Sequence, residues 1–213
     1  MTTKEKQADL YNKLSQQWGT FLGVINKIED TERKEACKQL AEKLHDRLIV
    51  CPASTKIEFT GAFPGGLVWH SLNVLANLKK LRTALAVEDC VSVDSIITLG
   101  LFHDIGKLGT EEEDYYLPQN SDWHRDKLGQ MFITNDELSS TSVSSRTLFW
   151  LNTYGIKLTA EEIEAITSIN SKSGNETVVV SQSFKDSWLT FLLQTAVKGA
   201  CLNSTRALSL LDV

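Results

Sequence analysis

The sequence predicts an all-α fold, and three observations lead to that expectation. Apolar residues recur at steps of three and four along most of the chain, which is the period of one helical face. No segment alternates apolar and polar residues for long enough to form a sheet. The 213 residues, 42% of them hydrophobic, suffice for one globular domain, or for one domain with a helical extension.

Residues 1–50 are expected to form an N-terminal helical hairpin. Residues 5–29 place apolar side chains along one helical face, at Leu10, Leu14, Trp18, Phe21, Ile25 and Ile28. A break at 29–31 offers side chains that can cap a second helix, which ends near Cys51. That helix is marked by Ala36, Leu40, Leu44 and Leu48. We expect the hairpin to pack on a larger unit formed by residues 51–213.

Loops and helices alternate through the central part of the chain. Residues 51–66 hold two of the three prolines and three glycines, which predicts an ordered loop. Helices are predicted over residues 67–85 and 93–105, the second closed by Gly106. The polar stretch 107–135 is interpreted as a long surface loop with at most one short helix.

The C-terminal part returns to helical spacing. A helix is predicted over residues 139–153, and Thr159 with Glu162 forms a capping box that opens another helix ending near Asn170. The remaining predicted elements are a turn at 171–174, a short strand or core plug at 178–180, and a last helix at 184–203.

Charge and composition narrow the classes of partner. The net charge of −5 argues against sequence-independent binding of nucleic acid, although one cationic pocket would still suffice for a small anion. No apolar run approaches the roughly 20 residues that span a bilayer, and the polar first residues are not a signal peptide. We therefore expect a soluble, cytoplasmic protein without a membrane partner, and the sequence leaves its oligomeric state open.

The four cysteines show no paired spacing and are interpreted as small core residues.

Two histidines stand in unusual surroundings. His103 and Asp104 end an apolar helix, where burying either side chain costs free energy unless it is paired or bound to a metal. His70 lies on the preceding helix, on an otherwise core-facing side. A single such histidine is more often a satisfied core residue, and a capped helix end explains most His-Asp pairs. The residues alone leave both readings open.

Two short motifs resemble the HD superfamily of metal-dependent phosphohydrolases. One reads Gly-Gly-Leu-x-x-His-Ser and contains His70, and the other reads Leu-x-His-Asp-Ile-Gly-Lys and contains His103, Asp104 and Lys107. The chain is most similar to short HD proteins of bacteria and their phages. The weaker similarities lie at Pro52–Thr55, Trp123–His124 and Leu158–Ile166. The resemblance implies an HD-type helical bundle over residues 48–200.

The resemblance implies a metal centre. His70, His103 and Asp104 would bind a divalent ion (Mn, Fe, Co, Ni, Zn or Mg), and Asp104 would also orient the attacking water. Imidazole and carboxylate ligands suit most of these ions, and an open coordination position lets water ionise near neutral pH and attack phosphorus.

Three further residues are expected to act on the substrate. Lys107 would supply positive charge to the phosphate as a second catalytic residue, although a solvated loop lysine is an equally good interpretation. Trp123 and His124 would contact the ligand, and otherwise His124 packs at the base of its loop.

The chain departs from the family at the fourth ligand, usually an aspartate on the last helix. Val197 stands at that place, and Asp186 on the same helix lies about 16 Å away, at about 1.5 Å of rise per residue. Thr60 and Ile169 stand where dinuclear relatives use further histidines, so a two-metal site is not expected. Three ligands can still hold a metal, as in catalytic zinc sites, with weaker binding expected. A carboxylate from 111–114, or a water, could complete the shell, although a run of charges of this kind is more often only a solvated segment.

Two functions from different classes follow. The leading hypothesis is a metal-dependent phosphohydrolase that acts on a nucleotide or other small phosphate ester. The alternative, motivated by Val197 and the long N-terminal hairpin, is a degenerate HD pseudoenzyme that binds a nucleotide or a protein partner without hydrolysis. The acidic charge and the lack of a basic stripe disfavour a nuclease.

Overall fold

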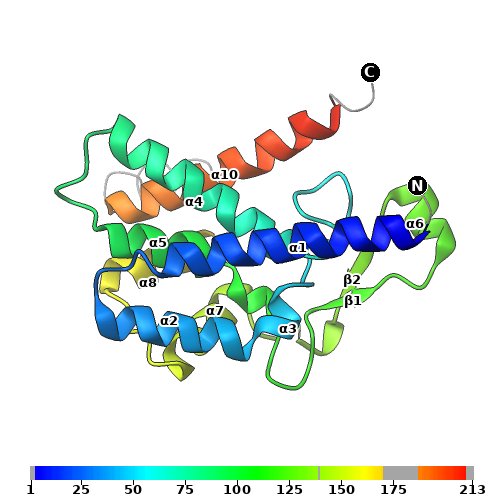
Figure 1. Cartoon of the computed structure of the whole chain (residues 1–213), viewed down its shortest axis with the longest axis horizontal. Coiled ribbons are helices and arrows are strands. Elements are labelled where there is room, and N and C mark those ends of the chain that lie inside the picture. Colours follow the sequence, from blue (N-terminus) through cyan, green and yellow to red (C-terminus); the bar gives the residue numbers. More distant parts are fainter. Residues whose placement is uncertain (1–2, 139, 170–186, 210–213) are drawn as a thin grey trace.

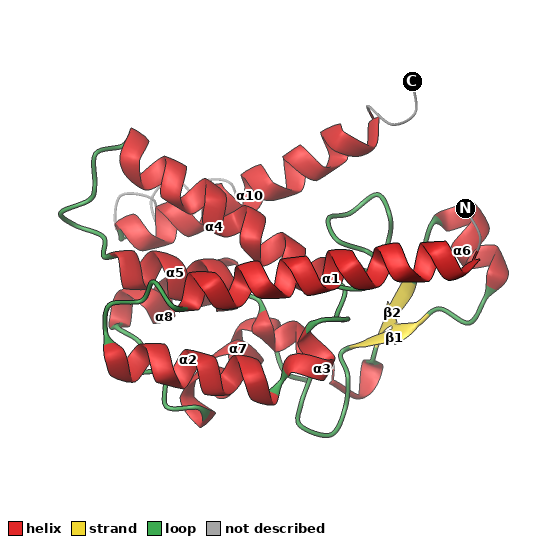
Figure 2. Cartoon of the chain, viewed as in Figure 1, coloured by secondary structure: helices red, strands yellow, loops and turns green. Residues whose placement is uncertain are grey.

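The computed structural model describes residues 3–138, 140–169 and 187–209, and most of these are helical (Figures 1 and 2). The predicted all-α class is confirmed. The α-helices are α1 (Thr3–Ile25), α2 (Thr31–Lys43), α3 (His45–Leu48), α4 (Gly66–Ala84), α5 (Val93–Phe102), α6 (Asp122–Leu128), α7 (Val143–Thr153), α8 (Ala160–Ile169) and α10 (Trp188–Ser209). Two 3-10 helices, η1 (Ile105–Leu108) and η2 (Asp136–Leu138), complete the helical elements of the described residues.

One continuous hydrophobic core runs through these helices. α4 packs against α5 and α10, and α8 packs against α7 and α10. The same cluster of buried side chains includes Phe21 of α1, Leu40 of α2, Leu99 of α5 and Leu192 of α10. The N-terminal helices therefore pack on the rest of the chain, as expected for the hairpin, and share its burial of apolar surface.

Buried polar contacts also hold α2 against α8. The Arg33 guanidinium donates to both carboxylate oxygens of Glu162, at 2.6 and 3.2 Å, and Glu162 is fully buried. The same carboxylate accepts a hydrogen bond from the backbone N–H of Thr159, whose hydroxyl accepts one from the N–H of Glu162. This is the predicted capping box, and the structure joins it to the N-terminal hairpin.

The interpretation of residues 107–135 as a loop was wrong in part, because the segment contains a small antiparallel sheet. β1 (Tyr116–Pro118) pairs with β2 (Phe132–Thr134), and α6 lies between them in the sequence. Each strand has only three residues, too few for a two-residue alternation to be recognised.

Two other predictions need correction. Leu10 is 41% exposed, so the first turns of α1 do not contribute to the core as the periodicity suggested. Gly106 lies inside η1 and does not close α5, which ends at Phe102.

Two of the four cysteines are buried and two are exposed. Cys37 and Cys51 are buried as expected, whereas Cys90 and Cys201 are exposed. No helix in the described ranges is long and apolar enough to cross a membrane. The predicted turn at 171–174, the predicted strand at 178–180, and Asp186 lie outside the described residues.

Candidate metal centre

His103 and Asp104 are buried because the helix before them is buried on every side. Ser92 caps α5, its hydroxyl accepting the N–H of Ser95, and all residues from Ser95 to Phe102 are buried. The chain therefore leaves α5 inside the core. At that point the exposed fraction is 0% for His103 and 4% for Asp104.

The ring of His103 is fixed by its own helix. Nδ1 lies 3.0 Å from the carbonyl oxygen of Leu99, one turn earlier. A carbonyl oxygen only accepts, so Nδ1 carries the proton and Nε2 keeps its lone pair. That Nε2 is buried and has no hydrogen-bond partner. A metal-ligating histidine characteristically has this arrangement, with one nitrogen held by a carbonyl and the other available to the ion.

His70 reaches the same place from α4. The helix starts after Gly65, whose φ of +82° suits glycine, and a Cβ on Gly66 would come within 1.9 Å of the Gly61 carbonyl oxygen. This close approach explains the Gly-Gly pair at the start of the motif. The imidazole is 3% exposed, and its Nδ1 has no partner.

The three side chains converge on one point. One ligand atom from each of His70, His103 and Asp104 lies within 4.8 Å of the other two. Oδ2 of Asp104 lies 3.9 Å from Nε2 of His70 and 3.6 Å from Nε2 of His103. Two ligands of one tetrahedral zinc ion would be about 3.4 Å apart, given bonds of about 2.1 Å. The cluster is close to the spacing that a single ion requires.

The charges also suit a cation. Burial lowers the pKa of His70 to about 3 and lowers the pKa of His103, so both rings are neutral near pH 7. Burial alone would raise the pKa of Asp104, but the Lys107 ammonium and the two imidazoles bring it below its ordinary value. Two neutral imidazoles and an ionised carboxylate are the protonation states that a metal needs.

Lys107 is part of the centre. Its Nζ lies 2.7 Å from Oδ2 of Asp104 and donates to the carbonyl oxygen of Ala53 at 2.9 Å. Burial acts to lower the pKa of Lys107, but the Asp104 carboxylate raises it above its ordinary value. The other oxygen of Asp104, Oδ1, is buried without a hydrogen-bond partner. The lysine therefore neutralises Oδ2, the oxygen that lies near both imidazoles, and the carboxylate keeps Oδ1 as an unsatisfied acceptor.

The turn that carries Asp104 and Lys107 is locked onto α7. The N–H of Gly106 donates to the Thr147 hydroxyl at 2.9 Å, and that hydroxyl donates to the carbonyl oxygen of His103. Nε of Arg146 donates to the carbonyl oxygen of Gly106. A Cβ on Gly106 would come within 2.1 Å of the Val143 carbonyl oxygen, so this glycine allows the close approach.

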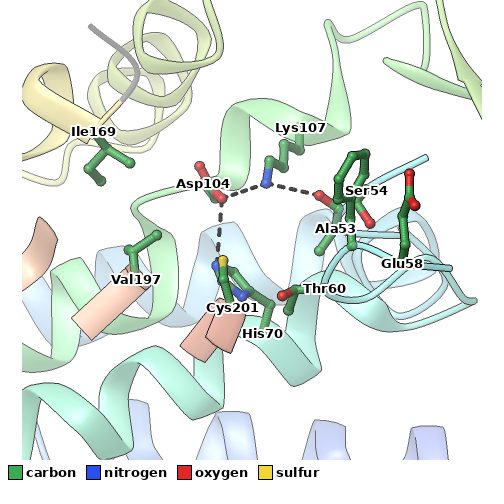
Figure 3. Close-up of a pocket in the computed structure, with 11 residues that line it drawn as sticks. Ala53, Ser54, Glu58, Thr60, His70, Asp104, Lys107, Ile169, Val197 and Cys201 are labelled. Atoms are coloured by element: carbon green, nitrogen blue, oxygen red, sulfur yellow. Dashed lines mark hydrogen bonds and ion pairs between the residues drawn. The ribbon is translucent and has the colours of Figure 1, made fainter. Parts of the chain in front are cut away.

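A pocket of about 380 Å³ opens over the cluster (Figure 3). Its polar lining comes from Ser54, Glu58, Thr60, His70, Asp104 and Lys107. Its remaining lining includes Phe59, Ile169, Val197 and Cys201. Thr60, Ile169 and Val197 therefore lie at the pocket wall.

Trp123 and His124 do not line this pocket, which corrects the expectation that they share it with Lys107. They lie on α6, where Trp123 is 59% exposed and Nδ1 of His124 lies 2.8 Å from the Ser121 hydroxyl oxygen. α6 connects strands β1 and β2, a small sheet that the sequence did not predict.

The acidic segment 111–114 lies elsewhere too. Glu111 and Glu112 line a different pocket, and the Asp114 carboxylate pairs with Arg47 at 2.7 Å. None of the segment lines the pocket over the cluster, so it does not complete the shell in this structure.

Sequence reasoning missed Ser54 and Cys201 as site residues. Ser54 lies in the Pro52–Thr55 segment that resembles the family, and its buried hydroxyl has no partner. Cys201 follows Val197 by four residues on α10, and that spacing could have indicated it.

We found no match to this chain among protein-family models, curated proteins or solved structures. The HD assignment therefore stays a prediction carried by the two motifs, and the metal-binding geometry rests on the structure alone.

Proposed function

We propose that this chain is a divalent-metal-dependent phosphohydrolase of the HD type that acts on a nucleotide or other small phosphate ester. The observation that carries the proposal is the buried His70, His103 and Asp104 cluster at the edge of an open pocket. A volume of about 380 Å³ is in the usual range for small-molecule pockets, roughly 300–1,000 Å³.

The residues of the cluster supply ligand atoms for an ion and one negative charge to balance it. His70 and His103 offer neutral nitrogens, and Asp104 offers a carboxylate whose Oδ2 lies near both of them and whose Oδ1 has no partner. A divalent ion held there would supply Lewis-acid chemistry, which ionises water near neutral pH and stabilises negative charge on phosphoryl oxygens.

Two pocket residues would bind the phosphate. Lys107 brings a positive charge that Asp104 keeps in place, and phosphate oxygens accept hydrogen bonds from such an ammonium. The Ser54 hydroxyl, buried and without a partner, supplies a further donor at the same wall. Together they favour an anionic substrate in spite of the acidic net charge.

A second candidate, a non-hydrolysing binding protein, is favoured by the apolar part of the wall. Val197 and Ile169 line the pocket without offering a ligand or a proton-transfer group. A pocket of this kind would retain affinity for a nucleotide while the reaction is slow or absent.

The experiment is a phosphate-release screen. Purified protein is loaded separately with Mn²⁺, Co²⁺ or Mg²⁺ and incubated with nucleoside mono-, di- and triphosphates and with small phosphomonoesters. Hydrolysis that is lost in Asp104→Asn supports the enzyme. Nucleotide binding by the metal-loaded protein with no phosphate release supports the second candidate, and neither binding nor release contradicts both.

A further inference from the structure

One wall of the pocket is formed by α10. Val197 and Cys201 are four residues apart on that helix, so their side chains share one helical face. Both line the pocket together with His70. Figure 3 draws Cys201 and His70 among the residues that line the pocket, and Glu58 lies at the right of that view.

We propose that the Cys201 thiolate supplies a fourth protein ligand to the ion held by His70, His103 and Asp104. The inference rests on the metal centre of the proposed function and goes beyond it, because it assigns the ligand and the class of metal. Val197 offers no donor atom, and the thiol one turn further along the same face does.

The buried, unpartnered atoms of the cluster are the independent sign that a cation is bound here. Nε2 of His103 and Oδ1 of Asp104 are acceptors without access to water and without a hydrogen-bond partner. Such atoms are costly to bury unless an ion or a donor satisfies them. Cys201 lines the same pocket as His70 and Asp104, but its thiol lies outside the group of ligand atoms that are within 4.8 Å of one another, so coordination requires rotation of the thiol about Cα–Cβ toward the ion.

Glu58 is a weaker candidate for the same role. Its side chain is 63% exposed and lies 3.7 Å from the Lys56 ammonium. Among the described lining residues, Cys201 is the one that provides a thiol, which is a soft donor.

Charge favours a second anionic ligand. A divalent ion that is bound by two neutral imidazoles and one carboxylate leaves an excess positive charge beside the Lys107 ammonium, in a buried site. Coordination would release the thiol proton to solvent and place a thiolate on the ion, which reduces that excess. Zinc-like ions expand to five ligands, so a position for water or a substrate oxygen is retained.

The consequence is a preference among metals. A site with two imidazoles, one carboxylate and one thiolate favours Zn²⁺, Fe²⁺ or Co²⁺, whereas Mg²⁺ and Mn²⁺ prefer oxygen ligands. The bound ion should therefore be Zn²⁺, Fe²⁺ or Co²⁺.

Cobalt titration tests the ligand directly. Co²⁺ added to the full chain should produce a thiolate-to-cobalt charge-transfer band in the near ultraviolet. Cys201→Ser should abolish the band. It should also weaken Co²⁺ binding about 10-fold, the lower end of the loss of affinity that follows when residues supporting metal ligands are changed. Cys90→Ser, which changes the other exposed cysteine, should retain both the band and the affinity.

Alkylation provides a second, non-spectroscopic measurement. Bound Zn²⁺ should slow the reaction of Cys201 with iodoacetamide at least about 10-fold, because a coordinated thiolate is occupied, and should leave Cys90 unaffected. Val197→Asp introduced into Cys201→Ser should restore Co²⁺ affinity without restoring the band.

The outcomes separate this inference from the proposed function. Co²⁺ uptake by the wild type with no charge-transfer band, and no protection of Cys201, overturns the thiolate ligand and leaves the metal centre standing. Failure of the folded wild type to bind Co²⁺ at all overturns both.

Discussion

The ammonium of Lys107 lies 2.7 Å from Oδ2 of Asp104, so the buried carboxylate is neutralised by the chain itself before any metal arrives. Both groups come from the same short turn, η1 and the residue before it. The lysine keeps Asp104 in a neutral pair in the metal-free centre, and a bound ion would add positive charge to that pair. The pairing also makes the metal-free protein dependent on the lysine.

Lys107→Met tests that dependence. The substitution leaves the Asp104 carboxylate buried and unpaired, which should lower the free energy of unfolding of the metal-free protein by roughly 3–5 kcal/mol. Zn²⁺ should recover much of that loss, so the metal-induced rise in melting temperature should be larger in the variant than in the wild type. Lys157→Met, at an ion pair whose side chains are both 87% exposed, is the control. Equal metal-induced shifts in all three proteins would refute the role given to Lys107.

Val197→Asp should restore the coordination that the valine lacks. Because Val197 lines the pocket, an aspartate there should strengthen Mn²⁺ or Zn²⁺ binding by about 10- to 100-fold and raise phosphate release. Val197→Leu, which keeps an apolar side chain at the position, should leave the affinity unchanged. Equilibrium dialysis measures the metal affinity of the wild type and of both variants. An unchanged affinity in a folded Val197→Asp protein would mean that α10 holds this position too far from the ion.

The unfolding free energy of the metal-free protein should depend on pH through the buried imidazoles. The pKa of His70 falls from 6.5 to about 3 on folding, so the unfolded chain binds more protons between those values. Stability should therefore be constant above about pH 7 and should fall below pH 6.5, by about 1.4 kcal/mol per pH unit for this residue. Asp104 and Lys107, which face it, keep their charges down to pH 5, and His103 adds to the slope in the same direction.

Urea unfolding in the presence of a chelator, at pH 5, 6, 7 and 8, measures this dependence. His70→Gln should have a shallower slope below pH 6.5 than the wild type. Identical slopes would show that the His70 ring is not held in its neutral form.

The contact between α2 and α8 should be a large contributor to stability. Arg33→Met leaves the fully buried Glu162 carboxylate without its cation and should lower the free energy of unfolding by roughly 3–5 kcal/mol. Glu32→Gln removes the exposed pair with Lys157 and should change it by less than about 0.5 kcal/mol. A similar loss of unfolding free energy in the two variants would mean that the buried pair stabilises the fold no more than the exposed pair does.

Much of the fold and the centre of the site could be predicted from the sequence. Helical periodicity located the main helices, because each buries one apolar face along its length. His70, His103 and Asp104 were singled out as polar residues at predicted core positions, and the resemblance of two motifs to the HD superfamily implied that they bind a metal. The structure brings all three together.

The rest depends on contacts that local patterns do not contain. The strands β1 and β2 are too short to show a period, and Trp123 and His124, on the helix between them, do not line the pocket. The pairing of Arg33 with Glu162 joins residues far apart in the sequence. Cys201 was interpreted as a core residue because thiols are usually buried, and only the direction of α10 shows it at the pocket.

Metal stoichiometry tests the central claim most directly. Equilibrium dialysis of the full chain against Zn²⁺ and Co²⁺, followed by elemental analysis, should give one ion per chain, with circular dichroism confirming that each variant is folded. Asp104→Asn and His103→Gln should each bind at least about 10-fold more weakly, because each removes a ligand atom of the cluster. A folded wild-type protein that takes up neither ion, or folded variants that bind as tightly as the wild type, would contradict the assignment of His70, His103 and Asp104 as a metal centre.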